Sequence, residues 1–302
     1  MNAALLDELS TKLLEGRKEI WLDQPSNLYL SEDQANVYLN LMDDPRYAEA
    51  FHDPVKMIIS AARNMIVAGL KEPIDILDLG PGYPDKTFPI LDLFKSGNLT
   101  GRYVPVDINR QFLNIAETAA IPFGVLTHPL HCLFETLPEI LNSSDFTSAG
   151  SRLVLLGLTF MNYRPTTILP LLQKLTRPSD TVVVATELFN EQDKATLIER
   201  YRINAAKELN LSVIRALAIP SSTVDYMARW SRNRIEMGFK VNQAITLTND
   251  LILQKGLRIL TAISYRYTLD GFRNRLQRHF ANVMLFTDPN STVAIAKCSQ
   301  AT

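Results

Sequence analysis

The segment Ile74–Thr87 constrains the fold more than any other part of the sequence. It joins an apolar run, Ile-Asp-Ile-Leu-Asp-Leu, to a Gly-Pro-Gly turn and then to a proline that can open a helix. A second apolar run, Tyr103–Asp107, follows and ends in an acid. Ligands bind at the carboxyl ends of parallel strands, where glycines let the backbone approach closely and an acid on the neighbouring strand can take up two ribose hydroxyls. The sequence therefore predicts the first half of a nucleotide-type crevice.

Strand-like runs alternate with stretches of helical character up to about residue 190. The runs are continuous rather than alternating, as in parallel strands that are buried on both faces. Further strands are expected at 123–126, 153–156 and 181–186, and helices at 1–20, within 31–70, at 109–119 and at 165–174. Pro84 suits the first position of another helix, which Pro89 should kink. This order predicts a parallel sheet with right-handed crossovers.

The pattern changes after Glu187. A polar helix is expected at about 192–209, followed by longer strand-like segments near 233–248 and 257–268 with no crossover helix between them. Residues 191–262 are therefore expected to form an inserted α+β lobe.

The end of the chain returns to the sheet. A helix at 268–279 precedes two strands, 283–286 and 293–296, whose short connection predicts an antiparallel pair at the sheet edge. Residues 1–190 and 263–302 are accordingly expected to form the main domain.

Charge, hydropathy and cysteine content exclude several classes of protein. The formal net charge is −1, so no overall field attracts nucleic acid or an anionic membrane. No apolar stretch reaches the roughly 20 residues that span a bilayer, and the N-terminus is unlike a signal peptide. Cys132 and Cys298 are too far apart in sequence to suggest a framework of disulfide bonds. The pair His128 and His131 lacks the further ligands that a metal site needs. We expect a cytoplasmic protein that binds a small molecule, with no metal, nucleic acid or membrane partner.

The residues after the first strand decide which ligand suits the crevice. A dinucleotide fingerprint needs a third glycine where Asp85 stands, and an acid there would oppose a pyrophosphate. This disfavours NAD and FAD. S-adenosylmethionine (SAM) has a ribose for Asp107, a sulfonium that tolerates a carboxylate, and an amino-acid end that needs a cation such as Lys86. Gly80 and Gly82 by themselves could also be ordinary turn chemistry.

Five landmarks, in order, resemble the histidine-specific methyltransferases of ergothioneine biosynthesis. Leu79–Thr87 is similar to the family's Leu-Gly-Ser-Gly-x-x-x-Lys-Thr, and Tyr103–Asp107 to its (Phe/Tyr)-x-Pro-x-Asp. Leu156–Pro165, Arg234–Met237 and Leu260–Tyr267 look like its Leu-Gly-Ser-Thr-Ile-Gly-Asn-x-x-Pro, Arg-Ile-Glu-Met and Thr-Glu-(Ile/Val)-Ser-x-Lys-(Phe/Tyr). The resemblance implies an α/β fold, with a Rossmann-like class I methyltransferase sheet and an inserted α+β substrate lobe, and SAM as the cofactor.

The resemblance also implies the roles of individual residues. The cofactor-binding positions that it implies are Gly80, Gly82, Lys86, Asp107 and Phe134. The substrate-binding positions are Tyr47, Asn162, Tyr201, Met237, Ala262 and Ser264. Among these, Asn162 and Tyr201 would hold the amino and carboxylate groups of an amino acid and are the catalytic candidates.

Three positions depart from the family pattern. Pro81 replaces a serine, and Leu133 replaces an aspartate that would take the adenine amino group. Ala262 stands where the family has a glutamate against the histidine imidazole, so a charge-assisted hydrogen bond worth roughly 1.5–3 kcal/mol is lost. The missing charge and the vacated volume favour a substrate other than histidine, with a larger or less basic side chain.

Several of these residues have a structural alternative. Asn162 could cap the helix that begins at Pro165, or it could simply form part of a turn. Tyr201 could be a half-buried tyrosine with a solvated hydroxyl, and Ser264 could bond a neighbouring carbonyl. Lys86 could be an ordinary solvated lysine.

The sequence predicts a SAM-dependent N-methyltransferase of secondary metabolism that acts on a free amino acid or a related small amine. One alternative keeps the class and changes the acceptor to another small-molecule nitrogen, in a side chain or a natural-product intermediate. A second is a non-catalytic SAM-binding protein, and a third, disfavoured by Asp85, is an NAD oxidoreductase.

Overall fold

The computed structural model describes residues 2–45, 49, 52–143, 146, 150–248 and 251–301. The chain divides into two compact units. The sheet unit comprises Pro45–Phe189 and Arg266–Thr302, and the lobe unit comprises Met1–Asp44 and Asn190–Tyr265. In the described residues no helix is both long and apolar enough to cross a membrane.

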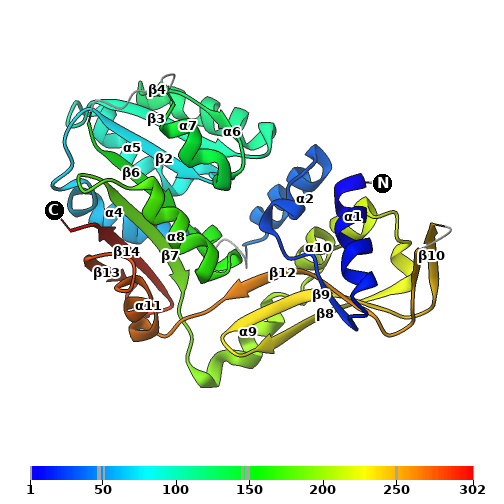
Figure 1. The fold of residues 1–302 in the computed structure, drawn as a ribbon. Helices are drawn as coiled ribbons and strands as arrows, with labels where there is room; N and C mark the ends of the chain where they lie inside the picture. The colour runs from blue at the N-terminus through cyan, green and yellow to red at the C-terminus, as the bar shows by residue number, and fades with distance from the viewer. Residues whose placement is uncertain are drawn as a thin grey trace. The chain divides into compact units, whose positions relative to one another are not determined.

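The sheet unit is built on one mostly parallel sheet with the strand order β13-β14-β7-β6-β2-β3-β4, and β5 also pairs with β3 (Figure 1). The pairs from β7 through β6 and β2 to β3, β4 and β5 are parallel, whereas β14 runs antiparallel to β7 and to β13. The strands are β2 (Ile74–Leu79), β3 (Gly101–Asp107), β4 (Leu126–Thr127), β5 (Leu130–His131), β6 (Arg152–Leu156), β7 (Thr181–Glu187), β13 (Asn282–Thr287) and β14 (Val293–Ser299).

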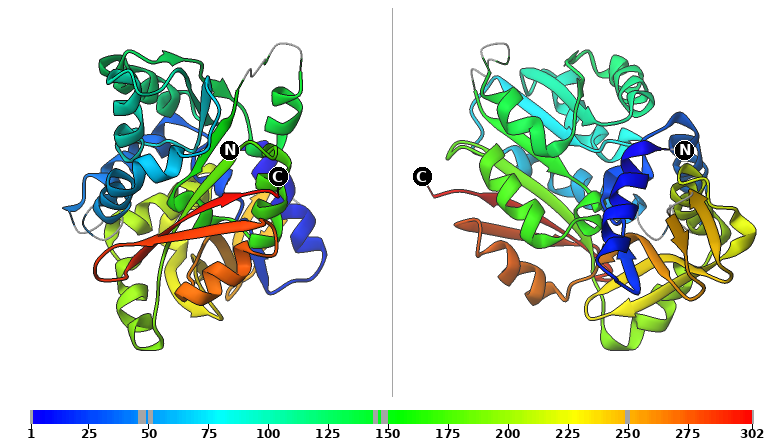
Figure 2. Two further views of the ribbon diagram at one scale, coloured as in Figure 1. Left: turned by 90° about the vertical axis from the view of Figure 1, so that its left-hand side faces the viewer. Right: turned by 45° about the vertical axis from the view of Figure 1, so that its right-hand side comes forward.

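Helices connect these strands. They are α4 (Asp53–Val67), α5 (Phe88–Lys95), α6 (Arg110–Ala120), α7 (Leu137–Leu141), α8 (Pro165–Leu175) and α11 (Leu269–Leu276). The antiparallel hairpin of β13 and β14, orange to red in Figure 2, ends the sheet as expected. The predicted fold class, an α/β protein with a Rossmann-like class I methyltransferase sheet, is confirmed.

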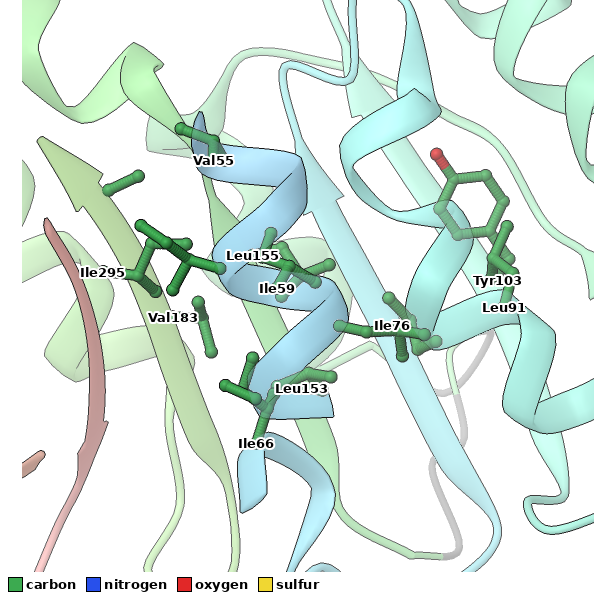
Figure 3. Close-up of a cluster of buried hydrophobic side chains, with 14 of the residues drawn as sticks. Val55, Ile59, Ile66, Ile76, Leu91, Tyr103, Leu153, Leu155, Val183 and Ile295 are labelled. Atoms are coloured by element: carbon green, nitrogen blue, oxygen red, sulfur yellow. The ribbon is translucent and has the colours of Figure 1, made fainter. Parts of the chain in front are cut away.

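The core lies between α4 and the middle of the sheet. Every residue of β2, β6 and β7 is buried, which agrees with their continuous apolar runs. Figure 3 shows Ile59 and Ile66 of α4 beside Leu153 and Leu155 of β6, in one buried cluster that also includes Ile295 of β14. This packing fixes the positions of the strands whose carboxyl ends carry the candidate site.

Two local predictions in the sheet unit are wrong. Pro84 begins a short 3-10 turn, Pro84–Lys86, and the helix starts only at Phe88, so Pro89 lies in its first turn, where a missing N–H costs nothing, and does not kink it. The strand expected at 123–126 is shorter, because Ile121–Phe123 forms a 3-10 turn that ends at Gly124.

The lobe unit contains a four-stranded sheet and a separate hairpin. The sheet has the order β1-β12-β9-β8, and β10 pairs with β11. The strands are β1 (Glu19–Trp21), β8 (Val224–Ser231), β9 (Arg234–Val241), β10 (Ile245–Thr248), β11 (Leu251–Leu253) and β12 (Arg258–Tyr265). The helices are α1 (Ala3–Leu14), α2 (Glu32–Met42), α9 (Lys194–Arg200) and α10 (Asn204–Ala216).

The lobe differs from the prediction in three respects. The single helix expected at 192–209 is two helices, which break at Tyr201. Strand β8 was missed, because its arginines suggest a solvated face. In addition, Met1–Asp44 groups with the lobe and not with the sheet unit.

A buried ion-pair network explains the arginines of β8 and β9. Glu236 is buried and accepts hydrogen bonds from Arg229 Nε (2.9 Å) and Arg234 Nη2 (2.7 Å). Burial alone would raise the pKa of Glu236, but the hydrogen bonds from Arg234 and Arg229 outweigh it and lower the pKa. The Arg-Ile-Glu-Met segment therefore stabilises the lobe sheet, since its carboxylate is fully paired.

Candidate active site

The turn after β2 brings the backbone close to two other loops. Gly80 and Gly82 have φ angles of +66° and +54°, in the left-handed region that favours glycine. A Cβ on Gly80 would lie 3.3 Å from Thr159 Oγ1 and 3.4 Å from Phe134 Cζ. The turn, the loop after β5 and the loop after β6 thus meet at the carboxyl ends of the strands, where the sequence predicted the cofactor site.

Lys86 is buried inside this arrangement. Its Nζ donates a hydrogen bond to the Pro81 carbonyl (2.8 Å) and lies 3.7 Å from Asp78 Oδ1. Its methylene groups pack against Gly157, where an added Cβ would lie 3.0 Å from Lys86 Cε. The solvated-lysine alternative is therefore wrong. The ammonium supports the glycine turn, and its contact with the amino-acid end of the cofactor stays a prediction.

Asp78 was not identified from the sequence. It is fully buried on β2, and its Oδ2 accepts hydrogen bonds from Thr87 Oγ1 (2.7 Å) and Tyr103 OH (3.0 Å). Burial and the Asp78 charge raise the pKa of the Tyr103 phenol, so that it stays a donor. The only sequence signal was an acid near the end of a largely apolar strand, which also contains Asp75. The cluster ties β2, β3 and the segment before α5 together beneath the glycine turn.

Asp107 ends β3 and is 7% exposed. Its Oδ1 accepts a hydrogen bond from the Asn109 amide (2.8 Å), and Asn109 in turn caps α6 through the Gln111 amide. Burial raises the pKa of Asp107 to about 7, against backbone hydrogen bonds from Asn109 and Ile108 that lower it. A buried carboxylate at this strand end fits the two hydroxyl donors of a ribose.

An aromatic pair lies next to the glycine turn. Phe134, which follows β5, stacks on Tyr163 with ring centroids 5.8 Å apart and an interplanar angle of 28°. Both rings are buried, whereas Leu133 is exposed. Burial, followed by the charges of Glu135 and Asp107, raises the pKa of Tyr163. Tyr163 was missed by the sequence interpretation, although it directly follows the predicted Asn162. A contact of Phe134 with the cofactor stays a prediction.

Asn162 ends the 3-10 turn Leu158–Asn162, which also carries Thr159. The capping alternative is wrong, because the N-cap of α8 is Arg164 and no side chain caps that helix, whereas the turn alternative agrees with the structure. Within the part of the chain that the structure describes, no side-chain hydrogen bond involves Asn162. Its amide is therefore available to a ligand.

The other predicted substrate residues lie in the lobe unit. Tyr201 OH lies 3.2 Å from Ser264 Oγ. Met237 of β9 is paired directly opposite Ala262 of β12, and all four side chains except that of Tyr201 are buried. Tyr47 lies outside the described residues.

The sequence interpretation also missed Asn210 of α10, which is buried against this group. Its Oδ1 accepts a hydrogen bond from Thr261 Oγ1 (2.7 Å), and its Nδ2 lies 3.9 Å from Met237 Sδ. The pairing register of β12 with β9 shifts between Leu260 and Ala262, and Thr261 at this point bonds Asn210 of α10. No local pattern marks a helix asparagine as the partner of a strand threonine.

The His131 ring contacts the backbone just after β3. Its Nε2 lies 2.7 Å from the Ile108 carbonyl oxygen. No group of three or more His, Cys, Asp or Glu side chains that could hold a metal ion occurs among the residues with described positions.

Comparison with known proteins gives one family. The family described as "Histidine-specific methyltransferase, SAM-dependent" matches residues 56–300. The histidine N-alpha-methyltransferase of Mycobacterium tuberculosis (strain CDC 1551 / Oshkosh) is 27% identical over 245 residues, which cover 74% of each chain.

Two solved methyltransferases resemble the structure more distantly. A SAM-dependent methyltransferase from Clostridium acetobutylicum gives a TM-score of 0.49 at 9% identity, over 88% of this chain and 99% of that one. A putative O-methyltransferase from Nostoc punctiforme gives 0.49 at 15% identity, over 98% and 68% of the two chains. Because the family match spans most of the sequence, the protein is a SAM-dependent methyltransferase that belongs to the histidine-specific methyltransferase family.

Proposed function

We propose that this enzyme transfers a methyl group from SAM to the nitrogen of a free amino acid or a related small amine other than histidine. The observation that carries the proposal is the position of Asn162. Its amide makes no side-chain hydrogen bond within the described structure, and the same short turn carries Thr159, which lies against the glycine turn of the cofactor site. An amide oxygen at that place can accept a hydrogen bond from an amine.

The residues present fit SAM. The Asp107 carboxylate would accept the ribose hydroxyls, the Gly80 turn would allow close approach of the backbone, and Phe134 with Tyr163 would flank the adenine. When bound, SAM supplies a methyl group on a positively charged sulfur. The role of the protein is to hold the acceptor nitrogen unprotonated and in line with that methyl group, and Asn162 would orient the nitrogen.

The surroundings of Ala262 support a substrate other than histidine. Its cross-strand neighbour is Met237, and the polar groups nearby, Asn210 and Thr261, are neutral and bonded to one another. Glu236, the acid adjacent to Met237 in sequence, is held by Arg229 and Arg234. These positions therefore offer no carboxylate to an imidazole, and they suit a larger or less basic side chain.

Replacing Ala262 with glutamate is expected to raise methylation of histidine by about tenfold, because the new carboxylate would gain one charge-assisted hydrogen bond to the imidazole. The measurement is the kcat/KM for histidine by mass spectrometry. Ala262→Gln fills the same volume without the charge and should give a smaller gain. Unchanged histidine turnover in both variants would count against the placement of Ala262 beside the substrate side chain.

The proposal as a whole is tested by incubating the protein and SAM with a metabolite library and identifying methylated products. Methylation on the nitrogen of one or a few amino acids or small amines is the expected result. Methylation of a natural-product intermediate that is not amino-acid-like would favour the alternative acceptor. Binding of S-adenosylhomocysteine without any methylated product would favour a non-catalytic protein.

Cofactor affinity is expected to rise with pH through about 7. Ribose hydroxyls donate to the ionised carboxylate, and the pKa of Asp107 is about 7, so that about a tenth of the protein is ionised at pH 6 and about nine-tenths at pH 8. Affinity for S-adenosylhomocysteine should therefore increase roughly tenfold, with proton release at pH 7. Calorimetry at three pH values, in buffers that differ in ionisation enthalpy, measures both quantities. A flat profile would argue that Asp107 does not bind the ribose.

A further inference from the structure

The lobe unit contains a groove of about 820 Å³ that includes none of the predicted site residues. One wall is formed by the end of α1 and the turn that follows it. The other wall is formed by the β10–β11 hairpin and the turn before β12. Its lining residues are Ser10, Leu13, Leu14, Gly16, Arg17, Lys18, Thr248, Leu251, Ile252, Gln254, Lys255, Gly256 and Leu257.

One end of the groove is cationic. Glu19 pairs with Arg258, and the Lys18 carbonyl accepts a hydrogen bond from the Arg258 amide (3.2 Å). By this parallel register Lys18 lies beside residue 257, which is the second residue after Lys255 in the sequence. Neither lysine forms an ion pair with any described residue, and the described residues that line the groove include no acid. These two charges are available to an anion.

The remaining wall is apolar and open to solvent. Leu14 is 90% exposed and Ile252 is 49% exposed, although both line a concave surface together with Leu13 and Leu251. Large apolar side chains gathered in a hollow, with a few charged groups at one end, are typical of a site for a small amphipathic ligand.

We propose that this groove binds a free amphipathic carboxylate, with its head group at Lys18 and Lys255 and its apolar chain along Leu14 and Ile252. The volume lies within the roughly 300–1,000 Å³ of small-molecule sites. A concave surface favours a single molecule that enters it over a flat membrane. The two lysines match the carboxylate in charge, and the leucines and isoleucine match the chain in polarity.

The test is titration calorimetry of the full chain with dodecanoate, with dodecanol as the probe that has the same chain and no charge. Saturable binding of one dodecanoate is expected, with dodecanol at least about tenfold weaker. The Lys18→Glu/Lys255→Glu variant should lose about tenfold or more in dodecanoate affinity, whereas Lys95→Glu, on the exposed face of α5, should not change it. Ile252→Gln should weaken both probes.

Several results would overturn the proposal. These are the absence of saturable dodecanoate binding, equal binding of dodecanol, or full dodecanoate affinity in the lysine double variant. Binding to anionic lipid vesicles without binding of free dodecanoate would instead identify a membrane contact. The melting temperature of each variant should equal that of the parent protein. This control establishes that the changes in affinity are effects on binding and not on folding. Methyl transfer should be unchanged in every variant, since none of these residues belongs to the candidate active site.

Discussion

Replacing Asp107 with asparagine is expected to lower the affinity for SAM by about 100-fold or more. The ionised carboxylate would accept two ribose hydroxyls, and hydrogen bonds to a charged group contribute roughly 1.5–3 kcal/mol each. An asparagine oxygen can still accept the Asn109 amide, so the turn that leads into α6 is retained. Calorimetry with SAM and with S-adenosylhomocysteine measures the loss, and Asp92→Asn, on the exposed face of α5, is the matched control.

The same substitution should not destabilise the free protein at neutral pH. Because burial raises the folded pKa of Asp107 to about 7, the folded state holds a proton that the unfolded state releases near pH 4. The contribution of this carboxyl group to stability is therefore largest below pH 4 and is lost as the pH rises to 7. Asp107→Asn is expected to have an equal or higher melting temperature at pH 8. Normal cofactor affinity in Asp107→Asn would refute the assignment of Asp107 to the ribose. A melting temperature below that of the parent protein would mean that the loss of affinity follows from a loss of folding.

Replacing Arg266 with methionine is expected to destabilise the protein by about 3–5 kcal/mol. Arg266 is 0% and Glu187 2% exposed, and Arg266 Nε lies 2.5 Å from Glu187 Oε2. Removal of the arginine takes the Arg266 charge away from the buried Glu187 carboxylate. Met161 Sδ lies 3.4 Å from Arg266 Nη1 and accepts the Glu187 amide at 3.1 Å, so the loop that carries Asn162 rests on this pair.

The control is the double variant Arg266→Met/Glu187→Leu, which removes both charges and keeps the volume. It should recover most of the lost stability in urea unfolding, because an apolar pair of similar size is often as stable as a buried ion pair. Two results would contradict this explanation by an uncompensated charge. One is a single variant as stable as the parent protein, and the other is a double variant no more stable than the single variant. The exposed pair Arg202–Glu199 provides a reference, since its disruption should cost less than about 1 kcal/mol.

Much of the sheet unit could be predicted from local patterns. Ile74–Leu79 and Thr181–Glu187 are continuous apolar runs because both of their faces are buried, and the structure confirms both strands. Gly80 and Gly82 were expected in a tight turn, and both have positive φ angles. The antiparallel end of the sheet followed from the short connection between its last two strands.

Other features depend on partners that are distant in sequence. By themselves the arginines of β8 suggest a solvated face. In the structure Arg229 Nη2 lies 2.7 Å from Glu236 Oε2 and 2.8 Å from Glu19 Oε2. Tyr201 and Ser264, 63 residues apart, meet through their hydroxyl groups. No window of the sequence contains both members of such a pair, so neither periodicity nor propensity can indicate the contact.

The sequence by itself determined the alternation of strands and helices in the sheet unit, the glycine turn and the acid after the second strand, because these follow from side-chain period, backbone conformation and residue type within a few positions. Only the tertiary structure decided that Lys86 supports the turn, that Tyr163 stacks on Phe134, and that Asp107 is buried enough to titrate near neutrality. Burial and hydrogen bonding between distant segments arise only when the chain has folded, and these two factors set the charge and availability of each group in the site.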